Sequence, residues 1–201
     1  MTCVAVFAST GAAFASTGAA FASAGGASES CQAQPVTTPF ANWGDQSSYF
    51  LAPGGSFEGT AAQVGWSLSG AGLTAGNEPF HAGGSSGRQS LTISGGGSAT
   101  APFFCLDSTM PDLRFFARQA APGSDLEVQA VVQIGHHQFV LPLGSVADGS
   151  MPAWGPVPQI VLQGHVLPRW LRLPVALRLV VPGGQGSWQL DDVYVDPFRL
   201  G

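Results

Sequence analysis

The sequence contains no lysine, few charged residues of either sign and only three cysteines. Charged side chains make up 9% of the 201 residues, and the formal net charge is −5. A chain with this charge has no electrostatic means of attracting nucleic acid or an anionic membrane surface, so neither is an expected partner. No uninterrupted apolar run reaches the roughly 18 residues that a membrane-spanning helix needs, so we expect no membrane span.

Sequence motifs for catalysis are also missing. The chain has no CxxC pair, no HExxH and no glycine-rich phosphate loop. Residues 83–87 match G-x-S-x-G only by composition, because no strand precedes the serine and no helix follows it. Asp191 and Asp192 are adjacent, so they diverge across a strand and cannot flank a substrate as the two acids of a glycoside hydrolase do. We therefore predict no catalytic residues and no enzyme activity.

Glycine, proline and short alternating segments are abundant instead. The chain has 28 glycines and 15 prolines, and 45% of its residues are apolar. This composition is typical of many short strands joined by tight turns. The clearest alternation runs through residues 126–134. The sequence predicts an all-β fold, an antiparallel β-sandwich of about eight to ten strands.

The first 30 residues have a different character. Residues 7–13 and 14–20 are near-exact repeats, and residues 21–27 repeat them imperfectly. Their small and apolar side chains resemble an export signal, with residues 22–24 as a cleavage tripeptide, although a basic start is missing. We expect residues 1–30 to be a low-complexity segment, signal-like or disordered. Residues 31–201 are expected to form one β-sandwich domain of a secreted or cell-surface protein.

Removal of that segment would leave two cysteines, Cys31 and Cys105. In a secreted protein the economical interpretation is a disulfide between them. By closing a loop of about 75 residues it would stabilise the fold by roughly 4 kcal/mol. Two buried free thiols are the alternative.

The last strand candidate, residues 186–198, has carboxylates among core-type residues. Simple alternation places Trp188, Leu190, Asp192 and Tyr194 on one face, and Gln189, Asp191, Val193 and Val195 on the other. Each face then mixes apolar and acidic side chains. Buried carboxylates are costly unless they are paired or bound to a metal, so a hard cation beside this strand is expected.

Two motifs carry a resemblance to a known family. Pro53-Gly-Gly-Ser-Phe-Glu-Gly59 precedes Gly65-Trp66, and Trp188-Gln-Leu-Asp-Asp-Val193 lies near the end. Together they resemble the galactose-binding-like jelly rolls, especially carbohydrate-binding modules with "G-x-F-E" before "G-W" and "I-D-D-V" in the last strand. The resemblance implies that the first and last strands are neighbours. It also implies a structural calcium held by Glu58 and one of Asp191 or Asp192, which suits the preference of calcium for hard oxygen ligands. The alternative is a Glu58 that is solvated or bound by backbone N–H groups.

A second resemblance covers most of the chain. Residues 31–200 resemble a group of uncharacterised secreted actinobacterial proteins through three blocks. These blocks are Trp43-Gly-Asp45, Gly76-Asn-Glu-Pro79 and Arg114-Phe-Phe-Ala-Arg118.

A jelly roll can bind glycan on an outer sheet face through stacking aromatic rings and planar hydrogen-bonding side chains. The candidate ligand-binding residues are Arg114, Phe116, Arg118, Gln129 and Gln133, and an ordinary solvated face is the alternative. Trp43, Trp154 and Trp170 lie in loop-like regions and are either stacking platforms or loop anchors. We predict a non-enzymatic secreted module that binds a glycan or cell-wall polysaccharide, with calcium as its one cofactor. The alternative is a structural or protein-interaction domain of the cell envelope with no sugar ligand.

Overall fold

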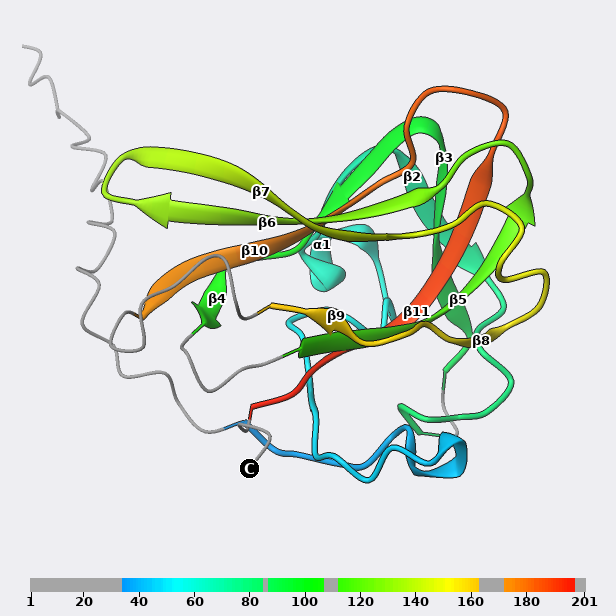
Figure 1. Cartoon of the computed structure of the whole chain (residues 1–201), viewed down its shortest axis with the longest axis horizontal. Helices are drawn as coiled ribbons and strands as arrows, with labels where there is room; N and C mark the ends of the chain where they lie inside the picture. The colour runs from blue at the N-terminus through cyan, green and yellow to red at the C-terminus, as the bar shows by residue number, and fades with distance from the viewer. Residues whose placement is uncertain (1–33, 85–86, 107–111, 163–171, 198–201) are drawn as a thin grey trace, which may run out of the picture.

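The computed structural model describes residues 34–84, 87–106, 112–162 and 172–197, which are mostly antiparallel strands (Figure 1). The longer strands are β2 (Ser67–Ala75), β3 (Gln89–Thr100), β5 (Asp112–Ala121), β6 (Leu126–Ile134), β7 (His137–Val146), β10 (Leu173–Val180) and β11 (Ser187–Val195). The short elements are η1 (Ala41–Trp43), β1 (Phe50–Leu51), α1 (Ala61–Val64), β4 (Phe104–Leu106), β8 (Gly155–Pro156) and β9 (Ile160–Val161). The all-β prediction is confirmed.

The strands form one continuous sheet that curls into two layers around the main core. Its order is β7-β6-β10-β3-β11-β5-β8, and every pairing is antiparallel. Strand β3 belongs to both layers, because residues 98–100 pair with β10 and residues 91–94 pair with β11. Side chains from both layers, such as Trp188, Phe115 and Leu177, are fully or almost fully buried between them. This is the predicted jelly-roll sandwich.

Three glycines allow β3 to pass between the layers. The strand continues through residues 95–97 without a break. A Cβ at Gly95 would collide with the carbonyl oxygen of Gly184, and one at Gly97 with that of Gly70. Gly70 itself lies at a register shift of β2, with a φ of +59°. Glycine is required here because neighbouring backbones approach too closely for any side chain.

The first strand lies beside the last, as the resemblance implied. Strand β1 pairs with β11, with Phe50 opposite Val195. The pairing extends past β1, since the amide of Ala52 donates to the carbonyl of Val193 at 2.8 Å and the amide of Val193 donates to Gly55 at 3.0 Å. Strand β11 is therefore hydrogen-bonded along both edges and lies at the centre of its layer.

The predicted alternation along β11 is wrong beyond Asp191. Asp192 has a φ of +47°, and the register with β5 shifts between Asp191 and Tyr194. Such a β-bulge inserts one residue and changes which side chains face the core. Trp188, Leu190, Val193 and Val195 therefore all lie in the main core, whereas Tyr194 belongs to a separate outer cluster.

Several predictions concern residues outside the described ranges. Cys105 on β4 is disulfide-bonded, but Cys31 is not among the described residues, so the Cys31–Cys105 pairing stays a prediction. The same holds for the role of Trp170, for the signal-like character of residues 1–30 and for secretion. Among the described residues, no helix has the length and apolar character needed to cross a membrane.

We expect Gly97→Ala to lower the free energy of unfolding by about 1–3 kcal/mol, because its methyl group must displace the backbone of β2 or β3. Gly72→Ala is the matched control on β2, since nothing lies within 4 Å of a Cβ there. The control should change stability by less than about 0.5 kcal/mol. Urea unfolding of both variants measures the difference, and equal stabilities would contradict the close approach of the two strands.

Candidate functional site

The candidate site lies on the face of β5 and β11 that is turned away from the main core. Leu113, Phe115 and Ala117 of β5 point into the core. Arg114, Phe116 and Arg118 alternate with them and therefore share the outer face. In the register of the two strands Tyr194 lies opposite Arg114, and Gln189 lies opposite Arg118.

Loops before β1 and before β3 cover the middle of this face with aromatic rings. Phe40, Tyr49, Phe116 and Tyr194 form a buried group, the outer aromatic cluster. Phe116 is fully buried, with the Phe40 ring stacked at 5.2 Å and the Trp43 and Phe80 rings at 5.4 and 5.6 Å. Phe116 is thus not the exposed stacking residue that its position on an outer face suggested, because the loops bury it. The accessible rings above it are Trp43 and Phe80, which are 38% and 41% exposed.

A hollow of about 320 Å³, the polar pocket, opens beside Trp43. Its lining residues are Trp43, Gly44, Asp45, Arg114 and Gln159. Arg114 forms an ion pair with Asp45 at 2.7 Å, and its Nε donates to the carbonyl of Val157 at 3.0 Å. Its guanidinium also lies 4.5 Å from the centre of the Phe40 ring. These contacts hold the planar guanidinium in one orientation.

A buried hydroxyl supports the pocket from below. The Tyr49 hydroxyl lies 2.7 Å from Oδ2 of Asp45 and 3.2 Å from Oδ1 of Asp112. Burial raises the pKa of Asp45, but the hydrogen bonds from Tyr49 and Arg114 outweigh it and hold the pKa below its usual value. Burial, followed by the charge of Asp196, raises the pKa of Asp112 to about 6. Asp45 is therefore an ionised acceptor beside a fixed donor, Arg114.

The five candidate ligand-binding residues do not form one surface. Strands β10, β3 and β11 lie between β6 and β5 in the sheet order, which separates Gln129 and Gln133 from Arg114 and Arg118. Gln129 donates to Glu127 at 3.2 Å, and Gln133 to the carbonyl of Gly135 at 3.3 Å.

Sequence analysis missed Asp45, Gln159 and Phe80 as members of the site. A signal for Asp45 was present, because it ends the block Trp43-Gly-Asp45. The structure brings this block together with Arg114-Phe-Phe-Ala-Arg118, while Phe80 directly follows the third block, Gly76-Asn-Glu-Pro79. Gln159 had no comparable signal in the proline-rich segment that contains it.

A buried acidic cluster of Glu78, Asp191 and Asp192 lies on the same face. The Glu78 carboxylate accepts the backbone N–H groups of Phe80, His81 and Ala82. Asp191 accepts the amides of Glu78 at 3.1 Å and of Asp192 at 2.9 Å. Burial, then the charge of Asp192, raises the pKa of Asp191 to about 8. Burial, then the charge of Glu78, raises the pKa of Asp192 to about 6.

The acidic residues do not assemble the predicted calcium site. Oε1 of Glu58 accepts the amides of Arg88 at 2.6 Å and Gln89 at 2.9 Å. This is the alternative in which backbone N–H groups bind the carboxylate. In the described ranges, no group of three or more Asp, Glu, His or Cys side chains is placed to hold a metal ion. Calcium binding by Glu58, Asp191 and Asp192 therefore stays a prediction without geometric support.

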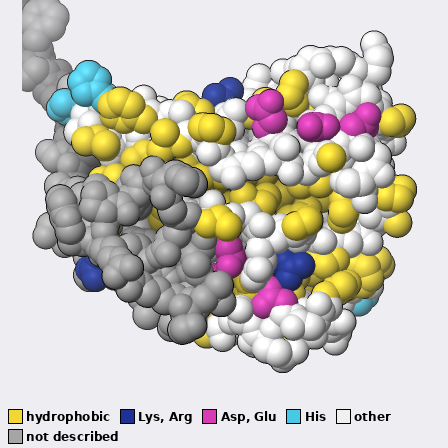
Figure 2. Space-filling view, in the orientation of Figure 1, with side chains coloured by type: hydrophobic (Ala, Val, Ile, Leu, Met, Phe, Trp, Pro, Cys, Tyr) yellow, Lys and Arg dark blue, Asp and Glu magenta, His cyan; other side chains and the backbone are white. Residues whose placement is uncertain are grey.

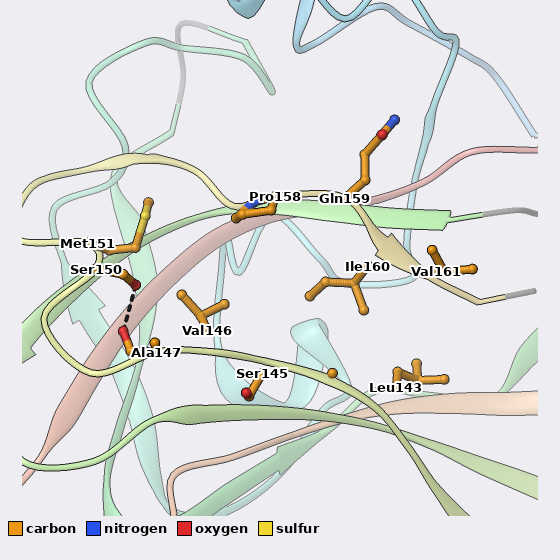
Figure 3. Close-up of a pocket in the computed structure, with 11 residues that line it drawn as sticks. Leu143, Ser145, Val146, Ala147, Ser150, Met151, Pro158, Gln159, Ile160 and Val161 are labelled. Atoms are coloured by element: carbon orange, nitrogen blue, oxygen red, sulfur yellow. Dashed lines mark hydrogen bonds between the residues drawn. The ribbon is translucent and has the colours of Figure 1, made fainter.

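A second cavity of about 550 Å³ lies between β7 and the segment that contains β9 (Figure 3). Its lining is largely aliphatic and includes Leu143, Val146, Met151, Ile160 and Val161. Figure 2 shows apolar side chains across the middle of this face of the molecule. Within the described part of the chain, the lining has no aromatic ring and no charged group. Ser145, Ser150 and Gln159 give it hydrogen-bonding groups, but it has no aromatic ring for a sugar to stack on, so the polar pocket is the better candidate site.

No protein-family model and no curated protein sequence matches this chain. Solved structures do match its fold. The CBM22-1 xylan-binding domain of Xyn10C from Paenibacillus barcinonensis has a TM-score of 0.50 and 15% identity, covering 73% of this chain and 93% of that domain. The tandem CBM22-1–CBM22-2 structure of the same protein has the same score and identity and covers 73% of this chain and 45% of that one. At this identity the likeness shows the fold alone, which confirms the jelly-roll resemblance of the sequence.

The acidic cluster makes stability depend on pH. Asp191 and Asp192 bind protons in the folded protein at pH values where the unfolded chain has lost them, so stability decreases as pH rises through the folded pKa values. We expect the free energy of unfolding to fall between about pH 5 and about pH 8, and Asp191→Asn to make this fall smaller. Asp125→Asn, which removes an exposed carboxylate, is the control. Urea unfolding across this pH range measures the slopes, and equal slopes would contradict a raised pKa for Asp191.

Calcium binding predicts a different dependence of stability on pH and on chelator. A bound ion would keep the carboxylates ionised, so a chelator would lower the melting temperature near neutral pH by linkage. With calcium present, the pH dependence would be weak. A melting curve that is unchanged by chelator would contradict calcium binding.

Proposed function

We propose that this chain, which has the fold of carbohydrate-binding modules, is a non-catalytic module that binds glycan at the polar pocket beside Trp43. The observation that supports this most directly is an accessible indole ring next to three planar hydrogen-bonding side chains, Asp45, Arg114 and Gln159. A sugar ring has an apolar face that packs on an aromatic ring and hydroxyl groups at its rim. Ligand sites typically combine such an apolar surface with a few fixed polar groups.

The polar groups of the pocket are held in place before any ligand arrives. Arg114 is fixed by Asp45, Val157 and the Phe40 ring, and Asp45 is fixed by Arg114 and Tyr49. A sugar hydroxyl both donates and accepts, so it can donate to the Asp45 carboxylate and accept from the Arg114 guanidinium. Little side-chain entropy is then lost on binding, which favours affinity.

The same arrangement argues against hydrolysis. Glycoside hydrolysis requires two carboxyl groups that flank the scissile bond. Among the described residues, Asp45 is the one acid that lines the pocket, and it is ion-paired. Asp112 is the nearest further acid in the network, but it is 3% exposed and lies behind the Tyr49 hydroxyl.

The partner that fits this site is an extracellular or cell-envelope polysaccharide. The solved domain that matches over 93% of its length is named as xylan-binding, which makes xylan a suitable first probe. The net charge of −5 disfavours densely anionic polysaccharides through long-range repulsion. Secretion belongs to the same proposal, because such partners lie outside the cytoplasm.

One observation favours the alternative of a protein-interaction domain. Ile134 and Phe139, which share one face near the end of the β6–β7 hairpin, are 52% and 49% exposed. Exposed apolar residues that cluster on a surface are typical of protein contacts. This role would be favoured if the intact protein bound no sugar.

We expect Trp43→Ala to weaken glycan binding by at least about tenfold, or ~1.4 kcal/mol, because the stacking surface is lost. Titration calorimetry with a panel of neutral polysaccharides that includes xylan measures this effect. Phe139→Ala is the control, since it removes an aromatic ring with 49% exposure on a distant strand. Binding of no polysaccharide, or equal affinities for the two variants, would contradict the proposal.

A further inference from the structure

We infer that the site continues from Trp43 along β5 to Trp154, so that its ligand is an extended oligosaccharide chain and not a single terminal sugar. This inference rests on the proposed function. It is carried by a second group of planar side chains on the same outer face, formed by Gln189, Arg118 and Trp154.

Strand register places these three side chains in one row. Gln189 of β11 lies opposite Arg118 of β5. On the other edge of β5, Phe116 pairs with Pro156 and Ala117 with Gly155, so the residue next to Arg118 is Trp154. Directly opposite residues of antiparallel strands project to the same face.

The contacts within the row repeat those of the polar pocket. Nε of Arg118 donates to Oε1 of Gln189. The Arg118 guanidinium lies 5.6 Å from the centre of the Trp154 ring. Arg118 is exposed and Trp154 half-buried, whereas Gln189 is 5% exposed. As at Trp43, an indole lies beside an arginine whose orientation is set by a fixed acceptor, which is a surface that a sugar ring can stack on and hydrogen-bond to.

The two groups belong to one surface. Arg114 and Arg118 are four residues apart on β5, which corresponds to roughly 13 Å along the strand. Trp154 packs against the outer aromatic cluster, which contains Phe116, and the half-exposed Phe80 ring lies over Phe116. Aromatic surface therefore continues between the two groups. A ligand that reaches both must be longer than one sugar ring.

Calorimetric titration of the full chain with neutral oligosaccharides, from the disaccharide to the hexasaccharide, tests the inference. Affinity should rise with chain length in the unmodified protein. Trp154→Ala should bind the shortest ligands with unchanged affinity. For the longer ligands, its affinity should be at least about fivefold lower than that of the unmodified protein. Arg118→Gln changes an exposed side chain and should reduce the same gain without disturbing the fold. Trp43→Ala should weaken binding at every length.

The outcomes separate the two proposals. If Trp43→Ala weakens binding while affinity is independent of length and Arg118→Gln binds normally, the extended site is wrong and the proposed function stands. If no oligosaccharide or polysaccharide binds, the proposed function fails and the extended site with it. Melting curves of each variant distinguish lost contacts from lost structure, and Phe139→Ala again serves as the control.

Discussion

The β-bulge at Asp192 is the feature on which the rest of the structure depends. Strand β11 is central in its layer, and each of its side chains must suit either the main core or the outer face. A regular strand would bury an acid among apolar residues on both faces. The bulge places Trp188, Leu190, Val193 and Val195 in the main core. It leaves Asp191 beside the loop amide of Glu78, which donates to its carboxylate, and it places Tyr194 in the outer aromatic cluster.

Asp191 and Tyr194 lie under the loops that carry the site. Asp191 accepts the amide of Glu78, and Glu78 in turn accepts three amides of the residues that include Phe80. Tyr194 packs edge-on against Phe40 at 5.7 Å. The loops that carry Trp43 and Phe80 are therefore attached to β11 from below, by buried hydrogen bonds in one case and by ring packing in the other. Exposed aromatic rings that are held in this way lose little freedom when a ligand covers them.

Much of the fold could be predicted from the sequence, but the site only in part. High glycine and proline content with short alternating segments indicated an all-β sandwich, and two end motifs indicated that the first and last strands are neighbours. The bulge was not predictable from alternation, because Asp tolerates a positive φ more readily than most residues but adopts it in only a minority of cases. The expectation that Gln129 and Arg118 share one surface did not hold. Strand order depends on long-range pairing, which local sequence patterns do not contain. The burial of Phe116 depends on loops that are distant in the chain. The three short blocks Trp43-Gly-Asp45, Gly76-Asn-Glu-Pro79 and Arg114-Phe-Phe-Ala-Arg118 did indicate residues of the site. The sequence did not indicate that these blocks meet on one face.

The pairing of β1 with β11 has a consequence for biosynthesis. Phe50 and Val195 are partners in the sheet although almost the whole domain separates them along the chain. Contacts of such high sequence separation form slowly, because a long loop must close first. Strand β11 follows all the other strands of the described sheet in the sequence, so the nascent chain carries an incomplete layer until β11 has been synthesised. An unfinished β-layer is prone to pairing with other chains. Strand β11 is thus both the centre of the finished layer and the last strand of this sheet to become available for folding.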